Sequence, residues 1–337
     1  MISIITPSFN RGYIIEETAE SIFAQTCEDW EWIIVDDGST DDSWDKLETF
    51  READERVRIF RRNREPKGAC TCRNIGAEMA KGTHIMFLDT DDLISPNCIK
   101  KRIDWIATSS APNLITFSQS VVFESSPYQG FLWDDPENPV SWLSGLFTSS
   151  PPCQGTAPLW PKDKFIDIGG WREDLRVWQD IELHIRAFAK GWCFQPSEDL
   201  EPDIFLRLSP DSISHVGFHS KEKLFSRWEV VKSVMQWYQC PDFDEQELAA
   251  FQRMVLSVFQ NALNHRDWVF SNEVINHTLN GGFISSQQAN WMSSYSRIYL
   301  WTLYRLPFTM KFVENRNCRL FPVPFSRTLG KIVWNKI

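Results

Sequence analysis

Short apolar runs alternate with amphipathic segments over the first hundred residues. The apolar runs are Ser3–Pro7, Trp32–Val35, Val57–Phe60 and Ile85–Leu88. Helical spacing of apolar positions covers Glu16–Ala24, Asp42–Ala53 and Ala69–Ala80. Near-continuous apolar strands separated by helices are typical of a mostly parallel sheet that helices cover on both faces. The pattern therefore predicts an α/β fold.

Acidic residues follow two of these strands directly. Asp36-Asp37 comes after the second run, and Asp89-Thr90-Asp91-Asp92 comes after the fourth. Ligands of open α/β sheets bind outside the carboxyl ends of the strands. We therefore expect both clusters to lie on the ligand-binding edge of the sheet.

The pattern changes toward the C-terminus. Another strand is expected over Pro112–Phe123, and Ser125–Ser150 is irregular, with many Pro, Gly and Ser residues. A helix is predicted at Ile181–Ala189, and beyond about Asp211 the chain reads as amphipathic helices at Lys221–Tyr238 and Glu245–Leu263.

The charge of the chain is negative but unevenly distributed. The 337 residues carry a formal net charge of −10, which excludes the basic footprint of a nucleic-acid binder. Tyr295–Ile337 carries +7, from eight Lys or Arg against one Glu, which leaves −17 for residues 1–294. That tail also holds many aromatic residues, a combination that suits anionic lipid headgroups. A folded helical cap whose aromatic residues face the core is the alternative.

The eight cysteines form no C-x-x-C pair and no zinc-type spacing, so free thiols in a reducing cytoplasm are expected. The first residues read as a buried strand rather than a signal peptide. No window of about 20 apolar residues predicts a membrane-spanning helix.

Each acidic cluster has two interpretations when taken alone. Asp89, Asp91 and Asp92 repel one another unless a divalent cation joins them, but they could also form an acidic turn before a helix. Asp36 could accept a hydrogen bond from a nucleotide base or ribose. It could equally belong to an ordinary turn in which Ser39 or Thr40 caps the next helix.

Four motifs in the same order resemble the family-2 glycosyltransferases of the GT-A fold, over Ile2 to about Ser214. They are Ser3-Ile4-Ile5-Thr6-Pro7-Ser8-Phe9-Asn10, Trp32-Ile33-Ile34-Val35-Asp36-Asp37-Gly38-Ser39-Thr40-Asp41, Lys67-Gly68-Ala69 with Arg73-Asn74-Ile75-Gly76, and Phe87-Leu88-Asp89-Thr90-Asp91-Asp92. The resemblance implies a Rossmann-like, mostly parallel sheet between helices, followed here by a helical C-terminal region.

The resemblance also implies a donor site. A nucleotide-diphosphate sugar, a UDP-sugar above all, would be held by Thr6, Pro7, Asn10, Asp36, Asp37, Arg73 and Asp89. Asp91, with Asp92 as an alternate ligand, would bind Mn²⁺ or Mg²⁺. A surface position on its helix is the alternative for Arg73.

A later segment, Ile168-Gly169-Gly170-Trp171 followed by Trp178-Gln179-Asp180, resembles the family's turn before the base-bearing helix. By this resemblance Asp180 is the general base. Gln179 stands where the family usually has Glu, which leaves the effect of that missing charge open. The alternative for Asp180 is an acid that favours the helix N-terminus.

Several aromatic and histidine residues have two possible interpretations. Trp160, Trp171 and Trp178 could stack on acceptor sugars or pack in the core. His184 could face the acceptor but is more typical of a core or surface histidine. His215 could bind metal or diphosphate, and His219 has no specific signal.

The implied reaction is an inverting transfer to a hydroxyl of a glycan or lipid-linked acceptor in cell-surface polysaccharide or glycoconjugate synthesis. Donor binding is assigned to residues 1–100, acceptor binding to 101–214 and the helical region to 215–337. A cytoplasmic location is expected, with peripheral attachment to the inner membrane face through the tail. A sugar nucleotidyltransferase and a catalytically silent nucleotide-sugar binder remain alternatives, although the first usually has a Gly-rich basic loop that Thr6–Gly12 lacks.

Overall fold

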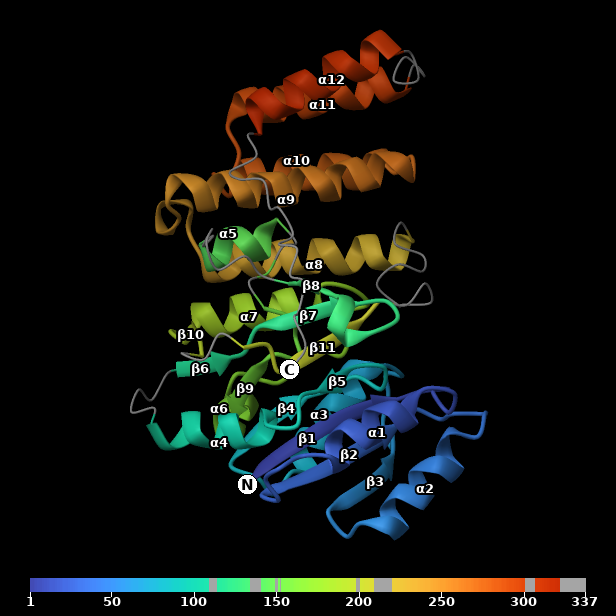
Figure 1. Ribbon diagram of the computed structural model, residues 1–337. Coiled ribbons are helices and arrows are strands. Elements are labelled where there is room, and N and C mark those ends of the chain that lie inside the picture. Colours follow the sequence, from blue (N-terminus) through green and yellow to red (C-terminus); the bar gives the residue numbers. More distant parts are fainter. Residues whose placement is uncertain are drawn as a thin grey trace.

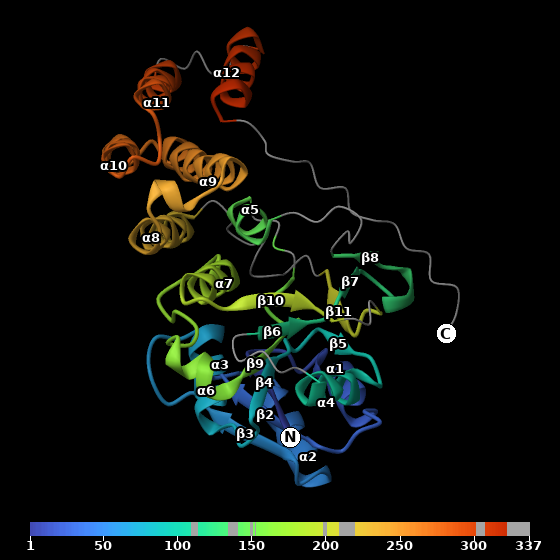
Figure 2. The ribbon, with the colours of Figure 1, turned by 90° about the vertical axis from the view of Figure 1, so that its left-hand side faces the viewer.

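The computed structural model describes residues 1–108, 114–133, 141–148, 151, 153–197, 201–208, 220–300 and 307–321. An α/β part comes first and a stack of helices follows it (Figures 1 and 2). His215, His219 and residues 322–337 lie outside the described residues.

The α/β part contains a seven-stranded sheet in the order β10-β6-β9-β4-β1-β2-β3. Its strands are β1 (Ile2–Ser8), β2 (Trp30–Asp36), β3 (Val57–Arg61), β4 (His84–Phe87), β6 (Leu114–Phe117), β9 (Pro158–Pro161) and β10 (Cys193–Pro196). All pairs are parallel except those that β9 makes with β4 and β6. The prediction of a mostly parallel sheet is confirmed.

The helices described in this part are α1 (Ile15–Phe23), α2 (Ser43–Ala53), α3 (Ala69–Met79), α4 (Cys98–Thr108), α5 (Trp142–Phe147), α6 (Lys162–Asp167) and α7 (Gln179–Ala189). Of these seven helices, the periodicity predicts the first three and the last. The other three were not predicted, and α5 lies within Ser125–Ser150, which was expected to be irregular. The expectation that Ser39 or Thr40 caps α2 is wrong. The N-cap of α2 is Asp42, without a side-chain hydrogen bond, and Ser39 Oγ instead accepts the backbone N–H of Asn10.

A small second sheet has the order β5-β11-β7-β8, from β5 (Leu93–Ile94), β7 (Ser120–Phe123), β8 (Phe131–Leu132) and β11 (Ile204–Arg207). The single strand expected over Pro112–Phe123 is therefore two strands, β6 and β7, in different sheets. The polar pair Ser118-Gln119 separates them, and Ser118 Oγ accepts a hydrogen bond from the buried Arg102. Buried polar groups need hydrogen-bond partners, and Arg102 supplies one for Ser118 at the point where the chain leaves the first sheet.

The helical region is a series of layers that extend away from the sheets (Figure 1). It contains α8 (Lys221–Trp237), α9 (Glu245–Asn264), α10 (Trp268–Asn280), α11 (Ser286–Leu300) and α12 (Pro307–Leu320). Asp244 caps α9 in a capping box with Glu247. Val313 and Phe321 belong to the buried core of this region, so this part of the tail packs as a folded cap. No helix within the described ranges is long and apolar enough to cross a bilayer.

Candidate active site

The carboxyl ends of β4, β1 and β2 lie side by side. Ser8 pairs with Asp36 and Ile5 pairs with Phe87, in parallel register. Parallel strands bring their carboxyl ends to one edge of a sheet, so the loops that hold Asn10, Asp36 and Asp89 meet there. The sequence placed both acidic clusters at this edge.

Asp36 offers a free acceptor in an otherwise bonded turn. Its side chain is 2% exposed, and Oδ2 accepts the backbone N–H groups of Gly38 and Ser39 at 3.0 Å each. Oδ1 is buried and has no hydrogen-bond partner among the described residues. Because a buried acceptor without a partner is costly, this oxygen is suited to a ligand N–H or O–H.

Asn10 joins the loops after β1 and β2. It has a positive φ of 51°, a conformation that Asn tolerates better than most residues. Its N–H donates to Ser39 Oγ at 2.9 Å, and its Oδ1 accepts the N–H of Thr40 at 2.8 Å. Asn10 therefore shapes the turn in which Asp36 lies.

Two of the expected donor residues, Thr6 and Asp37, already have partners within the protein. Thr6 is buried, and its Oγ1 accepts from Trp32 Nε1 at 2.9 Å, so this hydroxyl already has a partner in the core. Pro7 lies in β1, one residue before its end, and is half-buried. Asp37 is buried in an ion pair with Arg62, whose Nε lies 2.5 Å from Oδ1. These contacts indicate that Thr6 and Asp37 support the donor pocket from within the protein.

Asp89, Asp91 and Asp92 differ in where their carboxylates lie. Asp89 is 39% exposed and accepts from Arg73 Nη2 at 2.6 Å. Asp92 is buried, and its Oδ1 accepts the backbone N–H of Arg207 at 3.0 Å, which ties this loop to β11. Burial, together with the neighbouring Asp89, raises the pKa of Asp91 above its usual value.

The arrangement of Asp89 and Asp91 fits a divalent cation whose remaining ligands come from a substrate. The two neighbouring carboxylates repel each other, and the pKa of Asp91 is raised. A bound positive charge would relieve this repulsion. No group of three or more His, Cys, Asp or Glu side chains within the described part of the chain could hold a metal by itself. Mg²⁺ and similar ions commonly use one or two carboxylates plus substrate phosphates, which matches this donor set.

Arg73 occupies the centre of the site rather than a helix surface. Its guanidinium lies 4.9 Å from the centroid of the Trp171 ring and bonds Asp89. Burial opposes its charge, but Asp89 and, more weakly, Asp180 together hold the pKa of Arg73 above its usual value. Arg73 is thus close enough to both carboxylates to interact with them.

Asp180 lies in the first turn of α7, close to Trp171 and Gly155. A Cβ on Gly155 would lie 3.3 Å from Asp180 Cβ and 3.2 Å from Trp171 Cη2. Burial raises the pKa of Asp180, while the backbone N–H of Ile181, its own N–H and Arg73 lower it. A carboxylate with a raised pKa is better matched to proton abstraction near neutral pH.

The residue before Asp180 makes a structural contact that Glu could not make. Gln179 Nε2 donates to the carbonyl of Leu175 at 2.8 Å. A carboxylate has no donor for this carbonyl, so Gln179 closes the turn before α7 in a way that depends on its amide.

The surroundings of the tryptophans and of His184 indicate packing in the protein rather than stacking on a sugar. Trp160 and Trp171 are buried in the core that lies against the sheet. His184 is fully buried, stacks on Trp160 at 6.0 Å, and burial lowers its pKa to about 3. Trp178 is half-buried and packs against the core of the helical region. His184 is therefore a neutral core histidine.

Four residues that sequence reasoning did not single out support the site: Arg62, Asn74, Gly155 and Arg207. Asn74 stands in the quoted motif with Arg73, and its side chain bonds both the N–H and the carbonyl of Trp171. Arg207 is 115 residues from Asp92 along the chain, so no local sequence signal could have linked the two.

The chain resembles known proteins in its N-terminal part. Residues 3–141 match the family model "Glycosyl transferase family 2", so this stretch is a family-2 glycosyltransferase sequence. The chain is 33% identical over 132 residues to TuaG of Bacillus subtilis, provisionally named a teichuronic acid biosynthesis glycosyltransferase, covering 39% of this chain and 52% of TuaG. It is 39% identical over 108 residues to the Escherichia coli UDP-Glc:alpha-D-GlcNAc-diphosphoundecaprenol beta-1,3-glucosyltransferase WfaP, covering 32% of this chain and 42% of WfaP. The chain thus spans about half the length of these curated relatives.

Solved structures extend the similarity of fold into the helical region. Residues 1–349 of S. aureus TarS superpose with a TM-score of 0.63 at 17% identity, covering 93% of this chain and 91% of that one. The Pyrobaculum calidifontis mannosyltransferase PcManGT, solved with GDP-Man and Mn²⁺, gives 0.53 at 13% identity, covering 96% of this chain and 85% of that one. These likenesses confirm the GT-A fold with a helical C-terminal region.

Proposed function

We propose that this chain, a family-2 glycosyltransferase by its residues 3–141, transfers a sugar from a nucleotide-diphosphate donor to an acceptor hydroxyl with inversion. One observation carries the proposal. Arg73 bonds Asp89, and the charges of Arg73 and Asp89 both act on Asp180, which supports one shared site for the acid of the D-x-D motif and the expected base. A binding protein without activity would not need a half-buried base beside the donor site.

Asp36 is the proposed contact for the nucleotide base. Its unpartnered, buried Oδ1 supports this role, and Asn10 holds the turn around it. Thr6, Pro7 and Asp37 would shape the pocket from behind, since Thr6 and Asp37 are bonded within the protein.

Asp89 and Asp91 are the residues proposed to hold Mn²⁺ or Mg²⁺, with Asp92 fixing the loop that carries them. When bound, the ion would neutralise charge on the diphosphate of the departing nucleotide. Arg73, held over Trp171, would keep Asp89 in place and balance the acids around it.

Asp180 is the proposed general base. Its carboxylate would take the proton of the acceptor hydroxyl, whose oxygen forms the new bond to the anomeric carbon. The bond from that carbon to the nucleoside diphosphate breaks on the opposite face. A single displacement without an enzyme nucleophile inverts the configuration.

The acceptor is proposed to be a glycan or a lipid-linked sugar of cell-surface polysaccharide synthesis. This rests on WfaP, whose name gives a diphosphoundecaprenol acceptor and a UDP-sugar donor. We also propose that donor binding belongs to residues 1–100, acceptor binding to 101–214 and the helices to 215–337. A place on the cytoplasmic membrane face, through the basic tail, is part of the same proposal.

A donor screen tests the function. Purified protein is incubated with UDP-sugars and GDP-sugars, with and without lipid-linked acceptors, and nucleotide release is measured with Mn²⁺, Mg²⁺ or chelator. We expect release from one donor class, lost with chelator and with Asp180→Asn. Metal-dependent nucleotide binding without any transfer or hydrolysis would instead identify a silent binding protein.

A further inference from the structure

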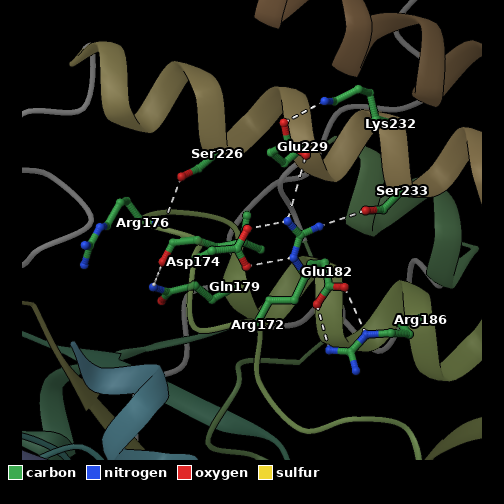
Figure 3. Close-up of polar contacts among 11 residues, drawn as sticks. Arg172, Asp174, Arg176, Gln179, Glu182, Arg186, Ser226, Glu229, Lys232 and Ser233 are labelled. Atoms are coloured by element: carbon green, nitrogen blue, oxygen red, sulfur yellow. Dashed lines mark hydrogen bonds and ion pairs between the residues drawn. The ribbon is translucent and has the colours of Figure 1, made fainter. Parts of the chain in front are cut away.

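The loop that leads to Asp180 is clamped between two parts of the molecule. On the sheet side, Asn74 of α3 bonds the backbone of Trp171 on both of its polar groups and also bonds Glu173. On the other side the loop contacts α8, the first helix of the helical region (Figure 3).

Two serines of α8 make the contacts on that side. Ser226 Oγ accepts the backbone N–H of Arg176 at 2.8 Å, and Ser233 Oγ accepts from Arg172 Nη1 at 3.0 Å. The serines are seven residues apart, which places them on one face of the helix, two turns from each other. Figure 3 shows Arg172 pointing to α8 and Ser226 lying above Arg176.

The loop is well ordered by further bonds within itself. Arg172 also forms an ion pair with Asp174 at 2.5 Å and lies 4.0 Å from Glu229 of α8. Arg186 of α7, paired with Glu182, donates to the carbonyls of Ile168 and Gly170. Backbone groups of Ile168, Gly170, Trp171 and Arg176 are therefore bonded to side chains of neighbouring elements.

Hydrophobic packing divides α7 between two cores. Leu183 and Ala187 face the core against the sheet. Leu175, Ile181 and Ile185 belong instead to the core of the helical region, together with Leu224, Trp228 and Val231 of α8. The residues on either side of Asp180 are thus fixed by the helical region as much as by the sheet.

Trp178 adds a strained element to this arrangement. Its φ is +60°, in the left-handed region that a bulky side chain rarely adopts. Its ring packs against the helical core and lies 5.6 Å from the guanidinium carbon of Arg227 on α8. Such a conformation persists where the surroundings hold it, and it commonly marks functional sites.

We propose that α8 is a positioning element for acceptor activation, with Ser226 and Ser233 as positioning residues that hold the loop before Asp180. The helical region would then set the geometry of the base while leaving donor binding to the sheet. This inference rests on the proposed function for its consequence in turnover, but the geometry of the loop can be tested separately.

The test compares full-length Ser226→Ala, Ser233→Ala and the double variant with Ser271→Ala. Ser271 is the matched control, because it is also a buried helical serine of this region, and its hydroxyl donates to the carbonyl of Asp267 at the start of its own helix. Hydrogen–deuterium exchange of peptides covering residues 172–183 reports the loop directly. UDP titration with Mn²⁺ and steady-state transfer kinetics report donor binding and chemistry.

We expect faster exchange in residues 172–183 for the α8 variants and not for Ser271→Ala. Turnover should fall roughly 5-fold for each single variant, the worth of one hydrogen bond, and more in the double variant. UDP affinity should stay within about 2-fold of the wild type, because the donor contacts are untouched.

Unchanged exchange of this loop in the double variant would overturn the proposal, whatever the activity. Equal loss of turnover in Ser271→Ala, or parallel loss of UDP affinity, would also overturn it, since either marks general destabilisation. A wild-type protein inactive with every donor would refute the proposed function, while the exchange data would still decide whether α8 holds the loop.

Discussion

Gly155 gives the sharpest steric test of the site, because a side chain added there would meet both the proposed base Asp180 and Trp171. In Gly155→Ala the new methyl carbon would lie 3.2 Å from Trp171 Cη2 and 3.3 Å from Asp180 Cβ. Both contacts are tighter than nine in ten real Cβ contacts, so a neighbour must move by a few tenths of an ångström.

Trp171 is the less movable of the two neighbours. Asn74 bonds its backbone twice, Phe87 packs edge-on at 5.2 Å, and Arg73 covers its ring. The displacement should therefore fall on Asp180 and on the segment around residue 155. Since a misplacement of about 1 Å can cost about 100-fold in rate, a few tenths should lower turnover about 3- to 10-fold.

The assay is steady-state transfer together with UDP titration and thermal unfolding. Turnover should fall while UDP affinity is unchanged, with a loss of stability of about 1 kcal/mol from overpacking. Gly281→Ala is the control for overpacking elsewhere, since its methyl would meet Met235 Cε at 2.7 Å and the Phe283 ring at 3.0 Å, outside the α/β part. Wild-type turnover in Gly155→Ala would refute the placement of Asp180 beside residue 155 in the working enzyme.

Five further expectations follow from the same site and from the tail. Asp91→Ala should abolish transfer and weaken metal-dependent UDP binding; unchanged titrations would remove Asp91 from the metal site. In Asp180→Asn turnover should fall by roughly 10²–10⁴, the usual worth of a positioned base, with donor affinity kept. Because burial raises the pKa of Asp180, its charged form costs stability above that pKa, so this variant should not melt lower at pH 7. For the same reason the acid limb of the wild-type pH–turnover profile should lie above about 3.9, the pKa of an ordinary Asp. Gln179→Glu should shift that limb to higher pH, since a carboxylate beside Asp180 raises the pKa of Asp180 and the bond to Leu175 is lost. An unchanged acid limb would show that residue 179 does not influence the pKa of the base. A chain ending at Phe321, which keeps the packed core intact, should lose co-sedimentation with anionic vesicles if the last residues bind membrane; equal binding by both chains would exclude that role.

The strands, the helices that follow them and the two acidic clusters were predictable because their signals are local. A buried strand must be apolar along its whole length, and the parallel order puts its last residue at the ligand edge. The strand expected over Pro112–Phe123 was divided in the structure because the bond from Arg102 to Ser118 is not visible in a hydrophobicity pattern.

The candidate site was predictable to the level of motifs, not to the level of individual side chains. Sequence reasoning grouped Thr6, Asp37 and Asp36 together as donor contacts. The structure distinguishes them by their partners: Trp32 bonds Thr6, Arg62 pairs with Asp37, and one oxygen of Asp36 has no partner among the described residues. Residue type and spacing are the same whether a side chain contacts the donor or bonds within the protein. Only the contacts between distant elements can distinguish these two roles.

The sequence by itself determined the α/β class, the family-2 resemblance and the positions of Asp36, Asp89 and Asp180 along the chain. Hydrophobic periodicity and motif order are properties of neighbouring residues, so they survive without a structure. The tertiary structure alone decided that Arg73 bonds Asp89 within range of the charge of Asp180, and that α8 bonds the loop before α7. These contacts join residues that are 16 to 107 positions apart or lie in different cores. A local sequence pattern cannot show such contacts, because only the complete fold brings these residues together.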